Sequence, residues 1–157
     1  MPVHRWLKFR EDAIFFVSHS SDRSHLARLH PVISPLVAIV EDDEALCFSL
    51  VDLMRSVGYH AEPFTSAESL LASSNLLVFD CVIADVHMPG MSGLNLVRNL
   101  QHQGCMTPVI LITALPDRQL DDDAISVGAQ RLLRKPFETK ALLDCVERSL
   151  SNERPRR

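Results

Sequence analysis

Six polar residues in this sequence have types and positions that could do chemistry together. They are Glu41, Asp42, Asp43, Asp85, Thr113 and Lys135. Each ends or closely follows an apolar run of strand length, such as LVAIV (36–40) before the first acids or PVILIT (108–113) up to the threonine. Taken alone, each has an ordinary structural explanation as a helix start, a turn cap, a strand residue or a surface cation. Their shared place at strand ends favours one common site.

Acids, a hydroxyl and a cation at one edge would suit phosphoryl chemistry with a metal ion. Hard oxygen ligands without His or Cys suit Mg²⁺, which binds through one or two carboxylates and keeps several waters. Crowded carboxylates repel one another, and a nearby cation such as Lys135 would relieve that repulsion. The lysine could also bind one phosphoryl oxygen, and the hydroxyl of Thr113 could bind another. Asp85 is then placed to accept a phosphoryl group as a nucleophile.

The elements that would position these residues alternate regularly from Leu36 onward. The expected strands are 36–40, 59–64, 78–85, 108–113 and 130–135. The expected helices are 44–58, 65–73, 92–103, 117–128 and 138–150. This alternation predicts an α/β fold, a doubly wound five-stranded parallel sheet with helices on both faces. The functional crevice of such a sheet lies beyond the carboxyl ends of its strands, where the six polar residues fall.

Local signals support several of these boundaries. Ser66 and Ser69 form a capping pattern, and Ser92 is expected as the N-cap of the next helix. Gly58 is expected to end the first helix. Pro63 indicates that its strand ends there or lies at the edge of the sheet.

Composition indicates one globular domain with a substantial core. The 157 residues are 46% hydrophobic and 23% charged, which is ordinary for a soluble protein. No apolar run approaches the roughly 20 residues of a membrane span. The run AIFFV (13–17) is too short for a signal-peptide core, so a cytoplasmic location is expected. Cys47, Cys81 and Cys145 lie in apolar-periodic segments and are expected to be buried, reduced thiols.

Charge and composition divide the chain into three parts. Residues 1–34 have five Lys/Arg against three Asp/Glu and are expected to be a flexible or poorly packed extension. A start codon assigned too far upstream would give the same appearance. Residues 35–151 form the expected domain, and 152–157 a short basic tail. The stretch 35–150 has eight Lys/Arg against sixteen Asp/Glu, so direct nucleic-acid binding is not expected.

Four motifs in order resemble the receiver domain of bacterial two-component response regulators. They are VEDDEAL (40–46), IADVHMPGMSGLNLV (83–97), VILITA (109–114) and RLLRKPFE (131–138). The resemblance spans roughly residues 36–150. It implies the flavodoxin-like strand order 2-1-3-4-5. It also implies a phosphoacceptor signalling domain rather than an enzyme.

The resemblance assigns a role to each acid. Asp85 is the phosphoacceptor, and Glu41 and Asp42 form an acidic pocket, with Asp43 as a further member. The implied cofactor is Mg²⁺, with Asp42, Asp85 and the main-chain carbonyl of His87 as its ligands.

The same resemblance assigns the switch residues and shows one departure. Thr113 would move toward the phosphoryl group, Lys135 would pair with it, and Lys135–Pro136 would be a cis peptide. Receivers usually carry Tyr or Phe three residues before the lysine, and this chain has Leu132 there. Phosphate acceptance does not need that ring. How a movement of Thr113 would reach the surface of the domain is therefore the open question.

Partners follow from the same resemblance. Only SNERPRR (151–157) follows the last expected helix, so we expect a stand-alone receiver. It would be phosphorylated by a sensor histidine kinase or a histidine phosphotransfer protein and would act on a downstream protein. Homodimerisation on phosphorylation stays open. Two alternatives remain: a degenerate receiver that binds a partner without phosphorylation, and an aspartyl-nucleophile phosphatase. Such phosphatases need a second acid two residues after the nucleophile, where this chain has His87.

Overall fold

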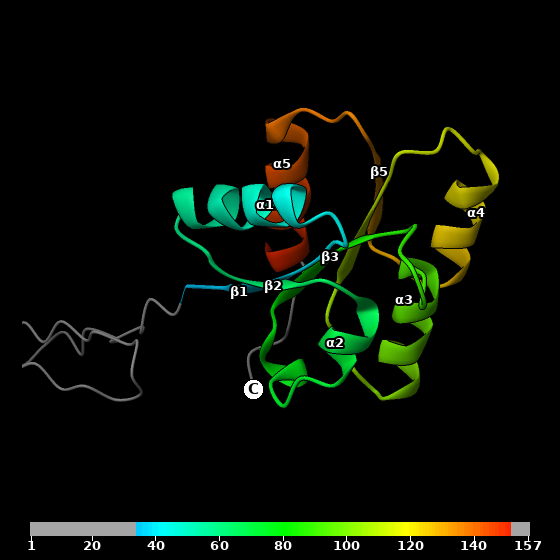
Figure 1. The fold of residues 1–157 in the computed structure, drawn as a ribbon, viewed down its shortest axis with the longest axis horizontal. Helices are drawn as coiled ribbons and strands as arrows, with labels where there is room; N and C mark the ends of the chain where they lie inside the picture. Colours follow the sequence, from blue (N-terminus) through cyan, green and yellow to red (C-terminus); the bar gives the residue numbers. More distant parts are fainter. Residues whose placement is uncertain (1–33, 152–157) are drawn as a thin grey trace, which may run out of the picture. The chain divides into compact units, whose positions relative to one another are not determined.

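Five strands and five α-helices alternate in the computed structural model, which describes residues 34–151 (Figure 1). The strands are β1 (Leu36–Val40), β2 (His60–Phe64), β3 (Cys81–Asp85), β4 (Val109–Thr113) and β5 (Arg131–Arg134). The helices are α1 (Glu44–Ser56), α2 (Ala67–Leu71), α3 (Gly93–His102), α4 (Gln119–Ser126) and α5 (Thr139–Ser151), with a short 3₁₀ helix η1 (Leu76–Val78). All strands pair in parallel, in the order β2-β1-β3-β4-β5. The predicted fold class and strand order are confirmed.

The three central strands are buried along almost their whole length. Every residue of β3 and β4 is buried, and so is every residue of β1 after the first. Strands covered on both faces read as continuous apolar runs, which is why these three could be found from the sequence. The edge strands β2 and β5 are partly exposed. Pro63 lies in β2, so the edge position that it indicated is correct.

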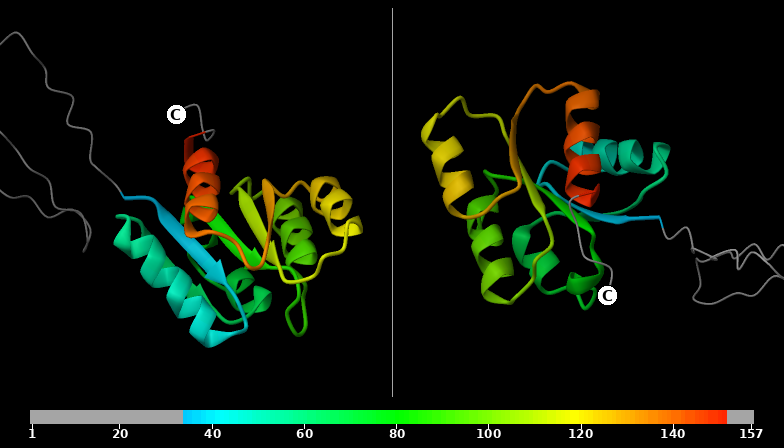
Figure 2. Two further views of the ribbon diagram at one scale, coloured as in Figure 1. Left: turned by 90° about the horizontal axis from the view of Figure 1, so that it is seen from above. Right: turned by 180° about the vertical axis from the view of Figure 1, so that it is seen from behind.

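Helices cover both faces of the sheet (Figures 1 and 2). Helices α1 and α5 lie on one face, and α2, α3 and α4 lie on the other. Neighbouring residues of one strand serve opposite faces, because side chains alternate along a strand. Ile39 belongs to the core under α1 and α5, whereas Val40 belongs to the core under the other three helices. Apolar cores on both faces therefore hold the sheet, and with it the positions of the carboxyl ends of the strands.

The third strand begins later than predicted. Its expected start was residue 78, whereas β3 begins at Cys81 and residues 76–78 form η1. Leu77 and Val78 are 69% and 48% exposed, so the apolar run that predicted a longer strand is not buried there. Asp80 then accepts a hydrogen bond from the Leu36 N–H at 2.9 Å, which joins the start of β3 to the start of β1.

The predicted helix caps are present. Ser66 accepts from the Ser69 N–H at 3.1 Å and Ser92 accepts from the Asn95 N–H at 3.2 Å. Gly58 follows α1 with φ +92°, a left-handed conformation that favours glycine. Helices α2 and α4 begin two residues later and end two residues earlier than the expected ranges 65–73 and 117–128.

The remaining predictions concern the cysteines, membrane spans and the two ends of the chain. Cys47 and Cys81 are buried as predicted, but Cys145 is only half-buried. Among the described residues, no helix is long and apolar enough to cross a membrane. Apart from Ser34, the predicted N-terminal extension and the tail 152–157 lie outside the described residues. The three-part division of the chain therefore stays a prediction.

Candidate functional site at the carboxyl edge of the sheet

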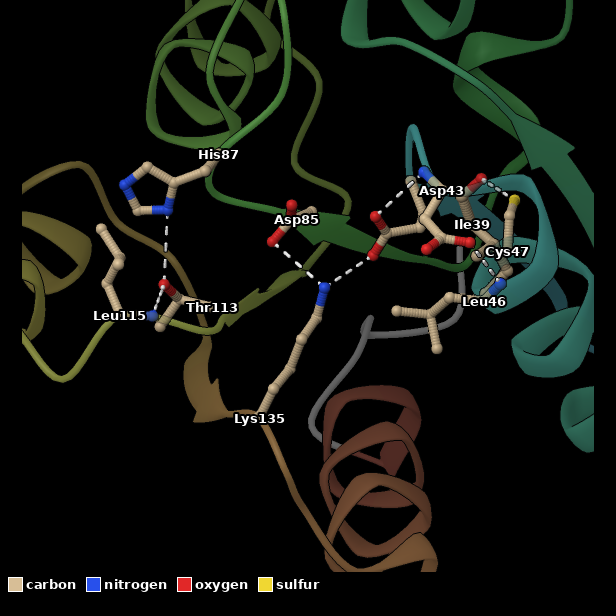
Figure 3. A network of polar contacts seen from close by, with 10 residues as sticks. Ile39, Asp43, Leu46, Cys47, Asp85, His87, Thr113, Leu115 and Lys135 are labelled. Atoms are coloured by element: carbon tan, nitrogen blue, oxygen red, sulfur yellow. Dashed lines mark hydrogen bonds and ion pairs between the residues drawn. The ribbon is translucent and has the colours of Figure 1, made fainter.

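Two buried carboxylates and one lysine meet where β1, β3 and β5 end (Figure 3). Glu41 follows β1 and Asp85 ends β3, and these residues are only 2% and 6% exposed. The Nζ atom of Lys135, directly after β5, lies 2.9 Å from Oε2 of Glu41 and 3.5 Å from Oδ1 of Asp85. The lysine thus bridges both acids. Without this cation, the two buried charges would be strongly destabilising.

A third carboxylate completes an oxygen-rich cluster. One ligand oxygen each of Glu41, Asp42 and Asp85 lies within 4.8 Å of the other two. These are hard oxygen donors, the ligand type that Mg²⁺ prefers. Asp43 takes a different place, because its Oδ1 accepts from the Leu46 N–H at 3.0 Å and caps α1. Of the four acids grouped by the sequence, the structure brings three together and uses the fourth as a helix cap.

Burial governs the protonation of the two enclosed acids. Loss of water raises the pKa of Glu41 and of Asp85 above their ordinary values. Lys135 acts in the opposite direction on both, through its hydrogen bond and its charge. The charge of Asp85 adds to the rise in the pKa of Glu41, and the charge of Asp42 adds to that of Asp85. Three carboxylates cluster around one lysine, so their combined negative charge would favour a further cation.

The hydroxyl of Thr113 is held by the loop that follows its own strand. Thr113 ends β4 with its side chain fully buried, and its Oγ1 accepts from the Leu115 N–H at 3.2 Å. The Nδ1 atom of His87 lies 3.4 Å from the same oxygen. Figure 3 shows Thr113, Leu115 and His87 together on one side of Asp85. The main-chain oxygen of Thr113 accepts from the Lys135 N–H at 2.7 Å, so β4 and β5 stay paired up to the site.

The main chain after Asp85 is held by close contacts. The Gly93 N–H donates to the Val86 carbonyl at 3.0 Å. A Cβ atom on Gly93 would lie 2.4 Å from the main-chain oxygen of Asp85, so no larger residue fits without movement. From α2, the carboxylate of Glu68 accepts from the Met91 N–H at 2.8 Å. These contacts fix the loop beside the carboxylate of Asp85.

Comparison with known proteins assigns this arrangement to a family. The family model described as "Response regulator receiver domain" matches residues 37–147. The chain belongs to the response-regulator receiver family. This receiver is 38% identical over 122 residues to Nodulation protein W of Bradyrhizobium diazoefficiens, covering 78% of this chain and 54% of that protein.

Solved structures agree with this assignment. The structure titled FixJ-N is 30% identical to this receiver with a TM-score of 0.72, covering 77% of this chain and 97% of its own. Chemotaxis protein CheY4 of Vibrio cholerae is 28% identical with a TM-score of 0.69, covering 74% of this chain and 99% of its own. The chain spans about half the length of the curated relatives it matches.

The receiver's remaining assigned residues lie on β5 and just beyond it. The Lys135–Pro136 peptide is cis. Leu132, three residues before the lysine, is half-buried beside Leu111 of β4 and contacts the core under α2, α3 and α4.

Arg134 is a residue of this receiver that the sequence did not single out. It donates hydrogen bonds to the main-chain oxygens of Leu115 and Asp117 and to the carboxylate of Asp121. A signal was present, because the acid-rich stretch 117–123 follows β4 and Arg134 ends the neighbouring strand. The sequence alone does not indicate which of those acids is the partner of Arg134.

Proposed function

We propose that this receiver accepts a phosphoryl group on Asp85 from a histidine kinase or a histidine phosphotransfer protein, and passes the signal on through protein contacts. The observation that carries the proposal is the amino group of Lys135, 2.9 Å from Glu41 and 3.5 Å from Asp85. It sets a positive charge beside the carboxylate that would react.

The proposed step exchanges one bond to phosphorus for another. A carboxylate oxygen of Asp85 forms the new bond, while the bond from phosphorus to the donor nitrogen breaks and its electron pair leaves with the donor. The amino group of Lys135 then pairs with a phosphoryl oxygen, and the hydroxyl of Thr113 turns toward another.

The donor set of the pocket fits a divalent cation. Asp42, Asp85 and the main-chain carbonyl of His87 would hold Mg²⁺, whose charge would offset that of the phosphoryl oxygens. The fit is supported by the cluster of three carboxylates, two of which share the single cation Lys135. Chelation of Mg²⁺ should therefore stop phosphoryl transfer.

The test is incorporation of label from radiolabelled acetyl phosphate with Mg²⁺. Wild type should become labelled, and Asp85→Asn should not. Asp80→Asn is the matched control, because it makes the same change directly before β3. Its amide oxygen can still accept from the Leu36 N–H, as the carboxylate does now at 2.9 Å. No label in the wild type, or equal label in Asp85→Asn, would refute the assignment.

The competing functions give different results in the same experiments. A phosphorylation-independent binding module would capture its partner equally well as wild type and as Asp85→Asn. A phosphatase would turn over a generic phosphate ester many times. The stand-alone form stays a prediction, since the chain spans about half the length of the curated relatives it matches. The cytoplasmic location likewise stays a prediction, and homodimerisation on phosphorylation stays open.

A further inference from the structure

Arg134 ties the loop between β4 and α4 to the end of β5. Its Nη1 donates to the main-chain oxygen of Leu115 at 2.6 Å, and its Nη2 donates to that of Asp117 at 2.9 Å. Nη2 also lies 2.7 Å from Oδ2 of Asp121 in the first turn of α4. A planar guanidinium can hold several acceptors in fixed directions, which a lysine cannot do. We call Arg134 with these three acceptors the arginine clasp.

The arginine clasp shares a residue with the contacts of Thr113. The Leu115 N–H donates to the hydroxyl oxygen of Thr113 at 3.2 Å, while the Leu115 carbonyl accepts from Arg134. The two main-chain groups of Leu115 therefore have different partners: its N–H binds Thr113 and its carbonyl binds Arg134. A continuous series of hydrogen bonds runs from Thr113 through Leu115 and Arg134 to Asp121 on α4.

The side chain at position 132 offers no comparable route. Leu132 contacts the apolar core and, with Ile125, lines a hollow between α4 and β5. A leucine has no donor or acceptor, so it cannot follow the hydroxyl of Thr113 through a hydrogen bond. The hydrogen bonds of Arg134 do depend on acceptor position, because such bonds weaken steeply when their geometry changes.

Exposure of the loop argues for a geometric role. Residues 114–119 are all exposed, so burial does little to hold them. The side chains of Arg134 and Asp121 are 35% and 52% exposed, and ion pairs in such surroundings add little stability. The arginine clasp therefore holds the loop in position more than it stabilises the fold.

We propose that the arginine clasp couples Thr113 to α4 in this receiver. When the hydroxyl of Thr113 turns to a phosphoryl group on Asp85, it draws Leu115 with it, and Arg134 passes that shift to α4. This inference rests on the proposed function, because Asp85 must carry the phosphoryl group. Arg134 is a positioning residue that does not touch the reacting atoms. It would replace the aromatic ring that position 132 lacks.

The test follows main-chain amides by two-dimensional NMR of the full chain before and after addition of beryllofluoride with Mg²⁺, a mimic of a phosphoryl group on aspartate. In the wild type, the amides of residues 85–87 and those of α4 should both shift. In Arg134→Gln, the first group should shift as in the wild type and α4 should lose most of its response. Asp121→Asn leaves both loop carbonyls bound to Arg134 and should give an intermediate response.

Arg131→Gln is the matched control, because it removes the same charge from the exposed start of the same strand. Both groups of amides should respond as in the wild type. A merely structural role would lower the melting temperature of Arg134→Gln without separating the two responses.

Two results would overturn the coupling. One is a wild-type response of α4 in Arg134→Gln. The other is an α4 that occupies its shifted position in Arg134→Gln before beryllofluoride is added, because Arg134 would then act as a lock. If the proposed phosphorylation of Asp85 is itself wrong, the result would differ. The amides of residues 85–87 in the wild type would not shift, and no label would be incorporated from acetyl phosphate. The proposed coupling of Thr113 to α4 would then be refuted together with the proposed function.

Discussion

Replacing Gly93 with alanine should destabilise the protein and impair the site, although alanine is the better helix former. Gly93 is the first residue of α3, where an alanine alone would be neutral or would add up to about 1 kcal/mol of helix stability. The added Cβ would lie 2.4 Å from the main-chain oxygen of Asp85 and 3.0 Å from Cδ2 of Leu111. Both neighbours are in the buried sheet.

The size of the effect follows from the movement required. Carbon–oxygen contacts are normally about 3.3 Å or longer, so the 2.4 Å separation must grow by about 0.9 Å. Part of that movement must come from backbone, which the 3.0 Å bond from the Gly93 N–H to Val86 resists. Overpacking of this kind costs about 1–3 kcal/mol. We expect a loss near 2 kcal/mol, which lowers the urea midpoint by about 1 M.

The site should suffer as well, because the displaced atom belongs to Asp85. Misplacement of a reacting group by about 1 Å can slow its reaction by up to about 100-fold, so labelling by acetyl phosphate should fall steeply. Gly104→Ala is the control, since Gly104 has φ +72° and a Cβ there would meet nothing within 4 Å. It should lose about 1 kcal/mol to backbone strain and keep normal labelling. A Gly93→Ala variant as stable as the wild type would refute the reasoning.

Two further predictions concern the acids. Asp43→Ala removes the cap on the Leu46 N–H, so thermal unfolding should show a loss of about 1 kcal/mol with labelling unchanged; reduced labelling would instead place Asp43 in the pocket. Burial raises the pKa of Glu41 and Asp85, so the folded state holds their protons more tightly than the unfolded chain. Stability without metal should therefore fall as the pH rises from the ordinary pKa values, near 4.5 and 3.8, through the raised ones. Asp85→Asn should flatten this fall in urea titrations at several pH values, and equal slopes in both proteins would contradict it.

The sequence was sufficient for the sheet because its central strands are buried on both faces. Runs such as VILIT (109–113) need no partner information to be recognised. It was insufficient at the start of β3, where Leu77 and Val78 look like strand residues but are exposed in η1. An apolar residue favours burial, but whether it is buried depends on the packing of the rest of the chain around it.

Some contacts of the site could likewise be predicted from the sequence, and others could not. Parallel strands end at one edge, so the meeting of Glu41, Asp85 and Lys135 followed from the fold class. The use of Asp43 as a helix cap did not follow, because adjacent carboxylates in a loop differ only in direction. The contacts of Arg134 depend on a side chain reaching 13 to 19 residues back along the chain, which no local pattern records.

The two edge strands of the sheet affect how readily this protein aggregates at high concentration. An unpaired strand edge is a template for intermolecular pairing and aggregation. At one border Pro63 removes a main-chain donor from β2, and at the other β5 has only four residues and carries arginine at both ends. Neither border is a good template for a strand from a second molecule. Copies that associate are thus directed to their helical surfaces rather than to the pairing of strand edges.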